Sequence, residues 1–177
     1  MNETVFGVRG EGKTWYLIDK IKSSPLPCIV IDTLRDPKDN YDKYAIRIYE
    51  PMILKFDMFK IVYTPETPVD FAAFCYHCAR MRNYRLIIDE VDFWSSNKKV
   101  PKELLNLYRY SRHYHIDIYA SCRNPYEIHR QLRGNTNTFV IYRLTEEGYL
   151  KYFEFFRKGI MSEIRSLPLH KNIRLDI

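Results

Sequence analysis

The chain has 177 residues, of which 28 are lysine or arginine and 22 are aspartate or glutamate, so its formal net charge is +6. Its hydrophobic fraction of 46% is enough to bury a core, and no apolar run approaches the ~18 residues that cross a membrane. The N-terminus also lacks the basic start and apolar core of a signal peptide. We therefore expect one soluble domain over residues 1–177, whose excess charge permits a polyanionic partner.

The first predicted elements surround a glycine-rich loop. Residues 4–6 are a candidate strand, and the apolar spacing of residues 13–24 predicts a helix. Between them the sequence fits G-x-x-x-x-G-K-[ST], in which glycines let the backbone approach phosphate and the helix start favours an anion. Lys13 is expected to reach the β- and γ-phosphates of ATP, and the Thr14 hydroxyl to bind Mg²⁺. The alternative is a flexible glycine-rich terminus. The expected nucleotide-binding residues are Gly7, Val8, Arg9, Gly10, Glu11, Gly12, Lys13, Thr14 and Trp15.

The next part of the chain is expected to contain strands followed by a helix. Residues 35–44 are polar and indicate a loop. Thr67 followed by proline predicts the start of a helix over 67–83. This helix contains Cys75 and Cys78, which we expect to be reduced core thiols, because a zinc site would need further ligands. Apolar runs predict strands at residues 28–33, 45–49, 52–56 and 59–64.

A second motif with chemical meaning ends the buried strand predicted at residues 85–90. Three apolar residues there are followed by Asp89 and Glu90, as in the acidic motif that accompanies a phosphate-binding loop. Asp89 is expected to hold Mg²⁺ through water, and Glu90 to orient and deprotonate the attacking water. The alternative is a solvated acidic turn, and Asp92 is interpreted as a surface or capping acid.

The last third of the chain is expected to continue the alternation. A helix is predicted at residues 100–115, and strands at 116–121 and 138–144. Residues 145–156 fit a turn and a returning hairpin strand, and the tail from Gly159 has no assigned structure. The predicted fold class is therefore α/β, with a mostly parallel central sheet flanked by helices and a C-terminal β-hairpin.

Three segments together resemble a known family. They are the glycine loop "GVRGEGKT", the acidic strand "LIIDE" and the stretch from "YRYSRHYHIDIYASC" to "IHRQLRG". Over residues 4–145 the chain resembles the FtsK–HerA superfamily of P-loop ATPases, in its viral genome-packaging and Zot-like branches. The resemblance implies a RecA-like P-loop NTPase fold and an Mg-dependent ATPase. It also implies a homo-oligomeric ring, a pentamer or hexamer, with the active site at a subunit boundary.

The resemblance suggests roles for further residues. Arg112 matches an arginine that reaches a neighbour's γ-phosphate as an arginine finger, with Arg109 in reserve. The alternative for Arg112 is a solvated surface arginine. Cys122 stands where the family usually has a polar sensor residue, so either Ser121 or Asn124 takes that role, or sensing is weak.

A basic group follows the strand at residues 116–121. Its DNA-binding candidates are Arg123, Arg130 and Arg133, next to His129. The alternative is a solvated face or a subunit contact.

The leading hypothesis from the sequence is an ATP-hydrolysing motor that moves viral double-stranded DNA into a capsid. Its implied partners are DNA and the capsid or membrane-vertex proteins, and its implied location is the host cytoplasm or the virion vertex. The rivals are a Zot-like ATPase that drives filamentous phage assembly and export, and a nucleotide-binding switch with little turnover.

Overall fold

The computed structural model describes residues 1–36, 38, 40–50 and 59–177. Their strands are β1 (Asn2–Phe6), β2 (Cys28–Asp32), β3 (Ile46–Ile48), β4 (Lys60–Tyr63), β5 (Tyr84–Asp89), β6 (Ile116–Cys122), β7 (Thr138–Tyr142) and β8 (Asn172–Asp176). Their α-helices are α1 (Lys13–Lys22), α2 (Pro68–Cys78), α3 (Val91–Trp94), α4 (Lys102–Tyr114), α5 (Arg130–Arg133), α6 (Glu147–Glu154) and α7 (Ile160–Arg165), and a 3₁₀ turn spans Tyr41–Lys43.

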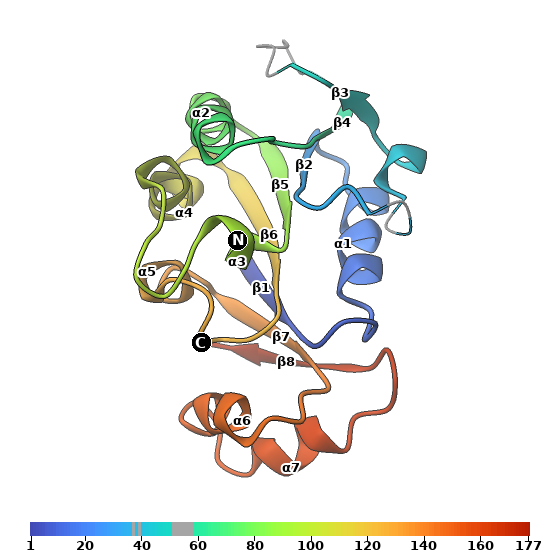
Figure 1. Ribbon diagram of the computed structural model, residues 1–177, viewed down its shortest axis with the longest axis vertical. Coiled ribbons are helices and arrows are strands. Elements are labelled where there is room, and N and C mark those ends of the chain that lie inside the picture. Colours follow the sequence, from blue (N-terminus) through green and yellow to red (C-terminus); the bar gives the residue numbers. More distant parts are fainter. Residues whose placement is uncertain (37, 39, 51–58) are drawn as a thin grey trace.

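The strands form one sheet in the order β3-β4-β2-β5-β6-β1-β7-β8. All neighbouring pairs are parallel except β7 and β8, which are antiparallel. Helix α1 covers one face of the sheet, and α2, α3, α4 and α5 lie on the other (Figure 1). The predicted α/β class, with a mostly parallel sheet between helices, is confirmed.

Alternating side chains of the inner strands fill two cores. Towards α1, Val5, Val30 and Ile87 pack against Leu17 and Ile21 of the helix. The residues that alternate with these along the same strands point to the other face of the sheet. There they pack against α2 and α4 in a larger core that includes many aromatic rings. Because both faces are covered, the inner strands are apolar almost throughout, which is why they were recognisable in the sequence.

The sheet topology brings the two sequence motifs together. β6 lies between β1 and β5, with Phe6 opposite Cys122 and Ile88 opposite Ala120. The three parallel strands therefore end at one edge of the sheet, where the glycine loop after β1 and the acidic pair after β5 meet.

The C-terminal β-hairpin predicted from the sequence is confirmed as the antiparallel pair β7 and β8, but its second strand lies elsewhere in the chain than predicted. Residues 145–156 were expected to return as a hairpin strand, but they contain helix α6. Leu150 and Phe153 are buried there at a spacing of three, which is helical rather than alternating. The antiparallel partner of β7 is instead β8, which follows α7 in the tail that had no assigned structure. The strand predicted at 52–56 lies outside the described residues.

The cysteine pair of the C-x-x-C segment belongs to the core. Cys75 and Cys78 are buried in α2, and burial raises the pKa of the Cys78 thiol to about 12. Among the described residues, no helix combines the length and apolarity needed to cross a bilayer.

Candidate active site

The loop between β1 and α1 has the backbone geometry that its glycines permit. Gly10 and Gly12 have φ angles of +86° and +111°, in a region that residues with a side chain rarely adopt. At Gly7 a Cβ atom would lie 2.8 Å from the Cβ of Tyr142, so a side chain there would displace β7. All three glycines are thus required by the fold of the loop.

Lys13 begins α1 and is held inside this loop. Its Nζ donates to the carbonyl oxygens of Gly7 at 2.6 Å and Val8 at 3.2 Å. The side chain is buried, and this desolvation lowers the pKa of the ammonium group. The ammonium therefore lies at the centre of the loop, next to Thr14 at the start of the helix.

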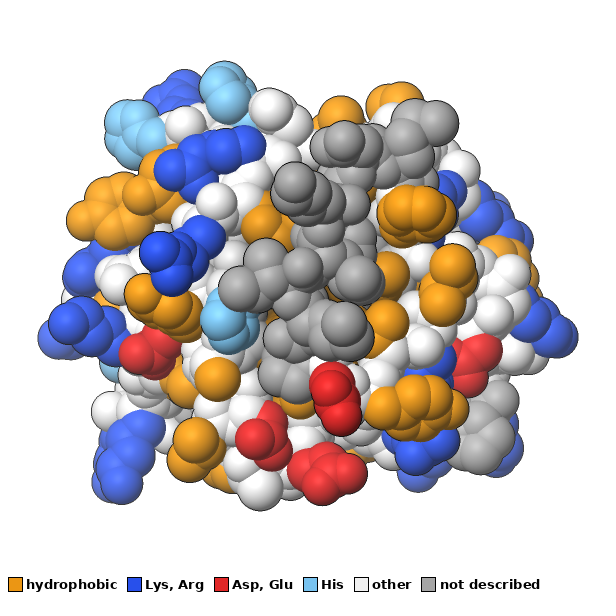
Figure 2. All heavy atoms as spheres, turned by 90° about the horizontal axis from the view of Figure 1, so that it is seen from above, with side chains coloured by type: hydrophobic (Ala, Val, Ile, Leu, Met, Phe, Trp, Pro, Cys, Tyr) orange, Lys and Arg blue, Asp and Glu red, His pale blue; other side chains and the backbone are white. Residues whose placement is uncertain are grey.

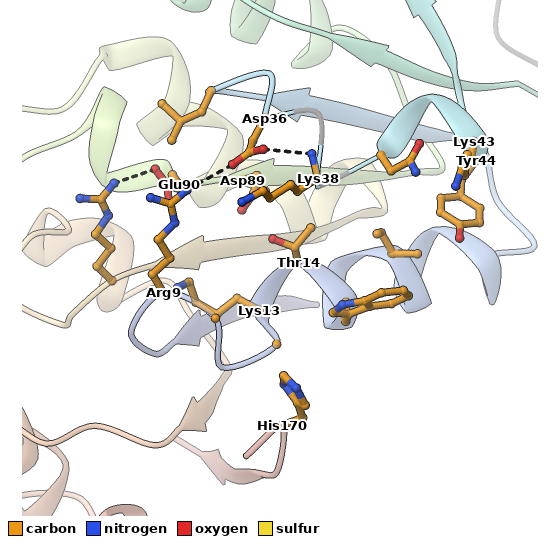
Figure 3. Close-up of a pocket in the computed structure, with 17 residues that line it drawn as sticks. Arg9, Lys13, Thr14, Asp36, Lys38, Lys43, Tyr44, Asp89, Glu90 and His170 are labelled. Carbon is orange, nitrogen blue, oxygen red and sulfur yellow. Dashed lines mark hydrogen bonds and ion pairs between the residues drawn. The ribbon is translucent and has the colours of Figure 1, made fainter.

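The loop borders a cavity of about 780 Å³. Its other wall is the segment after β2, which contributes Leu34, Asp36 and Lys38, and the acidic pair lies across from the loop (Figure 3). The cavity extends along α1 past Trp15 to Tyr44. A space of this size, with phosphate-binding backbone at one end and an aromatic wall at the other, suits a nucleotide.

Asp89 is buried at the end of β5. Its Oδ1 accepts a hydrogen bond from the Ser121 hydroxyl, and its Oδ2 accepts one from Tyr41 at 2.7 Å. Burial raises the pKa of this carboxyl, and the two hydrogen bonds oppose that shift. Asp89 and Thr14 line the same cavity and offer oxygen atoms, the ligand type that Mg²⁺ prefers.

Glu90 follows immediately and starts α3 with a left-handed backbone, at φ 52°. Its N–H donates to the Ser121 hydroxyl at 2.7 Å, and its Oε2 accepts a hydrogen bond from Arg123 at 3.1 Å. The left-handed turn separates the two neighbouring carboxylates, so Asp89 is buried while Glu90 reaches the cavity.

The three sensor candidates lie in different environments. Ser121 is buried between Asp89 and the backbone of Glu90. Cys122 is also buried, and its thiol donates to the carbonyl of Asn124 at 3.0 Å. The Asn124 side chain accepts from the N–H groups of the two residues that follow Pro125, which closes a turn. Of the three, Ser121 is the one whose side chain contacts the acidic pair.

The DNA-binding candidates do not form one cluster. Arg123 lines the cavity and pairs with Glu90. Arg133 donates to the carbonyl of Pro125, and its guanidinium lies 5.0 Å from the ring centre of Tyr152. Arg130 is exposed on the same short helix, α5. The arginines after β6 are therefore divided between the cavity and a separate helix.

Arg112 lies near the N-terminal ends of the parallel strands, whereas the cavity lies at their C-terminal ends. The arginine is exposed near the end of α4, which leads into Ile116, the first residue of β6. The seven residues of β6 span roughly 20 Å before the strand reaches the cavity. A helix that precedes a parallel strand must end where that strand begins, so the position is set by topology. Arg112 thus lies far from its own chain's cavity.

Basic side chains are a general feature of the molecular surface. The face seen from above carries lysine, arginine and histidine side chains gathered at its upper left (Figure 2). Exposed cations are common on this molecule, so a solvated surface role for Arg112 stays an alternative to the arginine finger.

Several residues that shape the site belong to no motif in the sequence. Arg143, just after β7, binds Glu11 of the loop, and Nδ1 of His170 donates to the Glu11 carbonyl at 3.2 Å. Tyr41 reaches Asp89 from the 3₁₀ turn. The chain separations are large, so no local pattern could have indicated these contacts.

Comparisons with known proteins agree with this geometry. No protein-family model and no curated protein sequence matches this chain. Among solved structures, the genome packaging NTPase B204 from Sulfolobus turreted icosahedral virus 2, in complex with ATP-γS, is similar with a TM-score of 0.81 and 15% identity. The match covers 99% of this chain and 91% of that chain.

Two further structures extend the comparison. B204, the DNA-packaging ATPase from Sulfolobus turreted icosahedral virus, matches with a TM-score of 0.79 and 17% identity, over 99% of this chain and 92% of that one. VirB4 of Thermoanaerobacter pseudethanolicus matches with a TM-score of 0.64 and 11% identity, over 99% and 88%.

These comparisons define the class of fold. With a glycine loop that encloses a lysine, an acid pair two strands away and these structural neighbours, the chain has the fold of a RecA-like P-loop NTPase. Viral genome-packaging NTPases are among the solved structures that share it, as the resemblance in the sequence had suggested.

Proposed function

We propose that this chain is a Mg²⁺-dependent ATPase whose residues 1–177 form one domain, and that it drives packaging of viral double-stranded DNA into a capsid. The observation that carries the enzymatic part is the convergence of Lys13, Thr14, Asp89 and Glu90 on one cavity. The packaging role is supported by the fold shared with B204 and by the net charge of +6.

The residues of the cavity divide the work of hydrolysis. The loop N–H groups and Lys13 would hold the β- and γ-phosphates. Mg²⁺, held by Thr14 and through water by Asp89, would neutralise phosphate charge. Glu90 would accept a proton from a water molecule while the oxygen of that water forms a bond to the γ-phosphorus. The bond between the γ-phosphorus and the bridging oxygen breaks at the same time, and ADP leaves. Ser121 holds the Asp89 carboxylate and the backbone N–H of Glu90.

In this proposal the protein works as a ring, and Arg112 supplies positive charge to the neighbouring subunit's γ-phosphate. The position of Arg112, at the end of β6 that is remote from its own chain's cavity, supports an effect between subunits. Arg130 is the exposed candidate for contact with DNA phosphates.

One assay separates the main hypotheses. ATP hydrolysis is measured with Mg²⁺ or with EDTA, and with or without double-stranded DNA, on the wild type and on Lys13→Ala as control. The packaging motor predicts Mg²⁺-dependent turnover that DNA stimulates. Turnover that DNA does not change would favour an assembly and export ATPase, and nucleotide binding without turnover would favour a switch.

A further inference from the structure

The geometry points to Arg123 as a ligand of the terminal phosphate of ATP bound to the same chain. While no triphosphate is bound, the Arg123 guanidinium pairs with Glu90 instead. This inference rests on the proposed function, since it requires ATP to bind beside Lys13. It gives Arg123 a role in the nucleotide site in place of the DNA contact expected from the sequence.

The first support is the position of the side chain. Arg123 follows directly after β6, the strand between those that carry the loop and the acidic pair. Its side chain lines the same cavity as Lys13, Thr14 and Glu90, and it forms an ion pair with Glu90 there. A phosphate held by the loop and reached by Glu90's water must therefore lie within the part of the cavity that Arg123 borders.

The second support is the nature of its present contact. One nitrogen of the guanidinium lies 3.1 Å from Oε2 of Glu90, and the Arg123 side chain is 59% exposed. An ion pair whose cation is this exposed contributes little stability, because water solvates the guanidinium well even without its partner, while Glu90 is 22% exposed. The terminal phosphate offers more negative charge, and its oxygens match the fork of the guanidinium. ATP can therefore compete with Glu90 for this arginine.

The exchange would link the state of Glu90 to the nucleotide. While Arg123 is on Glu90, one oxygen of that carboxylate is occupied. When Arg123 moves to the γ-phosphate, this oxygen becomes free to accept the proton of the attacking water. After hydrolysis and phosphate release, ADP lacks the group that attracted Arg123, and the ion pair forms again.

The backbone around Arg123 favours a movement of the side chain alone. Asn124 closes the following turn through two hydrogen bonds, and the Cys122 thiol donates to the Asn124 carbonyl in the same turn. Both residues are buried. The guanidinium can thus change partner through its own rotatable bonds while its Cα stays in place.

The test compares two nucleotides that differ in the γ-phosphate. Dissociation constants for Mg-ATPγS and Mg-ADP are measured by calorimetry. Arg123→Ala should weaken ATPγS binding about 10- to 100-fold, the range for a lost hydrogen bond to a charged group, and leave ADP binding unchanged. Arg123→Lys should recover part of the loss. Arg80→Ala, which removes an exposed arginine at the end of α2, is the matched control and should change neither constant.

A double-mutant cycle examines the competition itself. Glu90→Gln removes the anion that holds Arg123, so it should tighten ATPγS binding in the wild-type background. In the Arg123→Ala background the same substitution should give a smaller gain, because no guanidinium remains to be released. The difference between the two gains measures the coupling of the two side chains.

Each other outcome overturns the inference. Equal weakening of ATPγS and ADP would make Arg123 a structural residue of the cavity. If neither dissociation constant changes, Arg123 is a solvated surface residue or a DNA contact, as the sequence suggested. Equal gains from Glu90→Gln in both backgrounds would exclude an exchange. These failures differ from failure of the ATP site on which the inference rests, in which the wild type would bind neither nucleotide.

Discussion

The guanidinium of Arg143 binds one carboxylate oxygen of Glu11 with two nitrogens, at 2.7 and 3.1 Å. Glu11 is only 3% exposed, and its second oxygen is buried without a hydrogen-bond partner among the described residues. Glu11 belongs to the glycine loop and Arg143 to the end of β7. Arg143, which lies outside the phosphate-loop motif, therefore holds the loop against the end of β7.

Arg143→Ala should destabilise the protein and weaken nucleotide binding. It leaves a buried carboxylate without its cation, and breaking a buried pair typically costs about 3–5 kcal/mol. Arg143 is 40% exposed, so solvent screening reduces the expected loss to about 1–3 kcal/mol. Urea unfolding measures it. The double variant Glu11→Gln with Arg143→Ala should regain part of this stability, and a double variant no more stable than Arg143→Ala would contradict the explanation.

Lys13→Ala should abolish measurable ATP binding, because no other cation in the loop lies at its centre. Calorimetry with Mg-ATP provides the measurement. Since Lys13 also donates to two loop carbonyls, the melting temperature must be compared with that of the wild type. A folded variant with wild-type affinity would refute the assignment of the phosphate loop.

Glu90→Gln should bind ATP and hydrolyse it slowly. The amide keeps the shape of the side chain but cannot take the proton of water, and loss of a general base typically costs a factor of ~10²–10⁴. Single-turnover hydrolysis separates this loss from slow product release. Asp89→Asn is the comparison variant and should mainly alter the Mg²⁺ dependence. If Glu90→Gln turns over normally, another acid is the base.

Arg112→Ala should leave ATP binding intact, because the residue is far from its own chain's cavity. It should depress hydrolysis, because the neighbouring subunit's γ-phosphate loses a positive charge. Mixing Arg112→Ala with Glu90→Gln protein should restore some activity, since some subunit boundaries then pair an intact base with an intact finger. Arg109→Ala is tested in parallel. Absence of recovery in mixtures shown to co-assemble would argue against a site shared between subunits.

Asp92→Asn should stabilise the protein more at pH 7.5 than at pH 5. Burial raises the pKa of Asp92 to about 6 from an ordinary value of 3.8, so the folded state favours the protonated form. The destabilisation by the charged form therefore grows as the pH rises through about 6, and it is absent below the unfolded-state pKa. The gain at high pH should be about 2 kcal/mol or less. Urea unfolding across this range checks it, and a gain that does not depend on pH would contradict it.

Local patterns account for what the sequence could predict. The glycine loop and the acidic strand were recognisable because each motif lies within a few consecutive residues, and the inner strands because they are buried on both faces. The contacts between Arg123 and Glu90, or His170 and Glu11, join residues 33 and 159 positions apart, so only the folded chain reveals them. Residues 145–156 were misjudged because a dense run of aromatic side chains concealed their helical spacing.

The distance of Arg112 from the cavity shows the same limit in another way. The sequence places Arg112 just before the strand that leads to the site, and the resemblance implied that it reaches a neighbouring subunit's γ-phosphate. The direction of that strand puts it at the other end. The sequence therefore indicated which strand Arg112 precedes, but not how far it lies from its own chain's cavity.

All four cysteines are buried free thiols, and burial raises the pKa of each. Thiols in this state react slowly with maleimides and with oxygen, because the reactive species is the thiolate. A single cysteine introduced on the surface would thus be labelled selectively without removal of the natural ones. Fluorescent dyes could then be attached to neighbouring subunits of the proposed ring, and their energy transfer would test whether the subunits assemble and move during turnover.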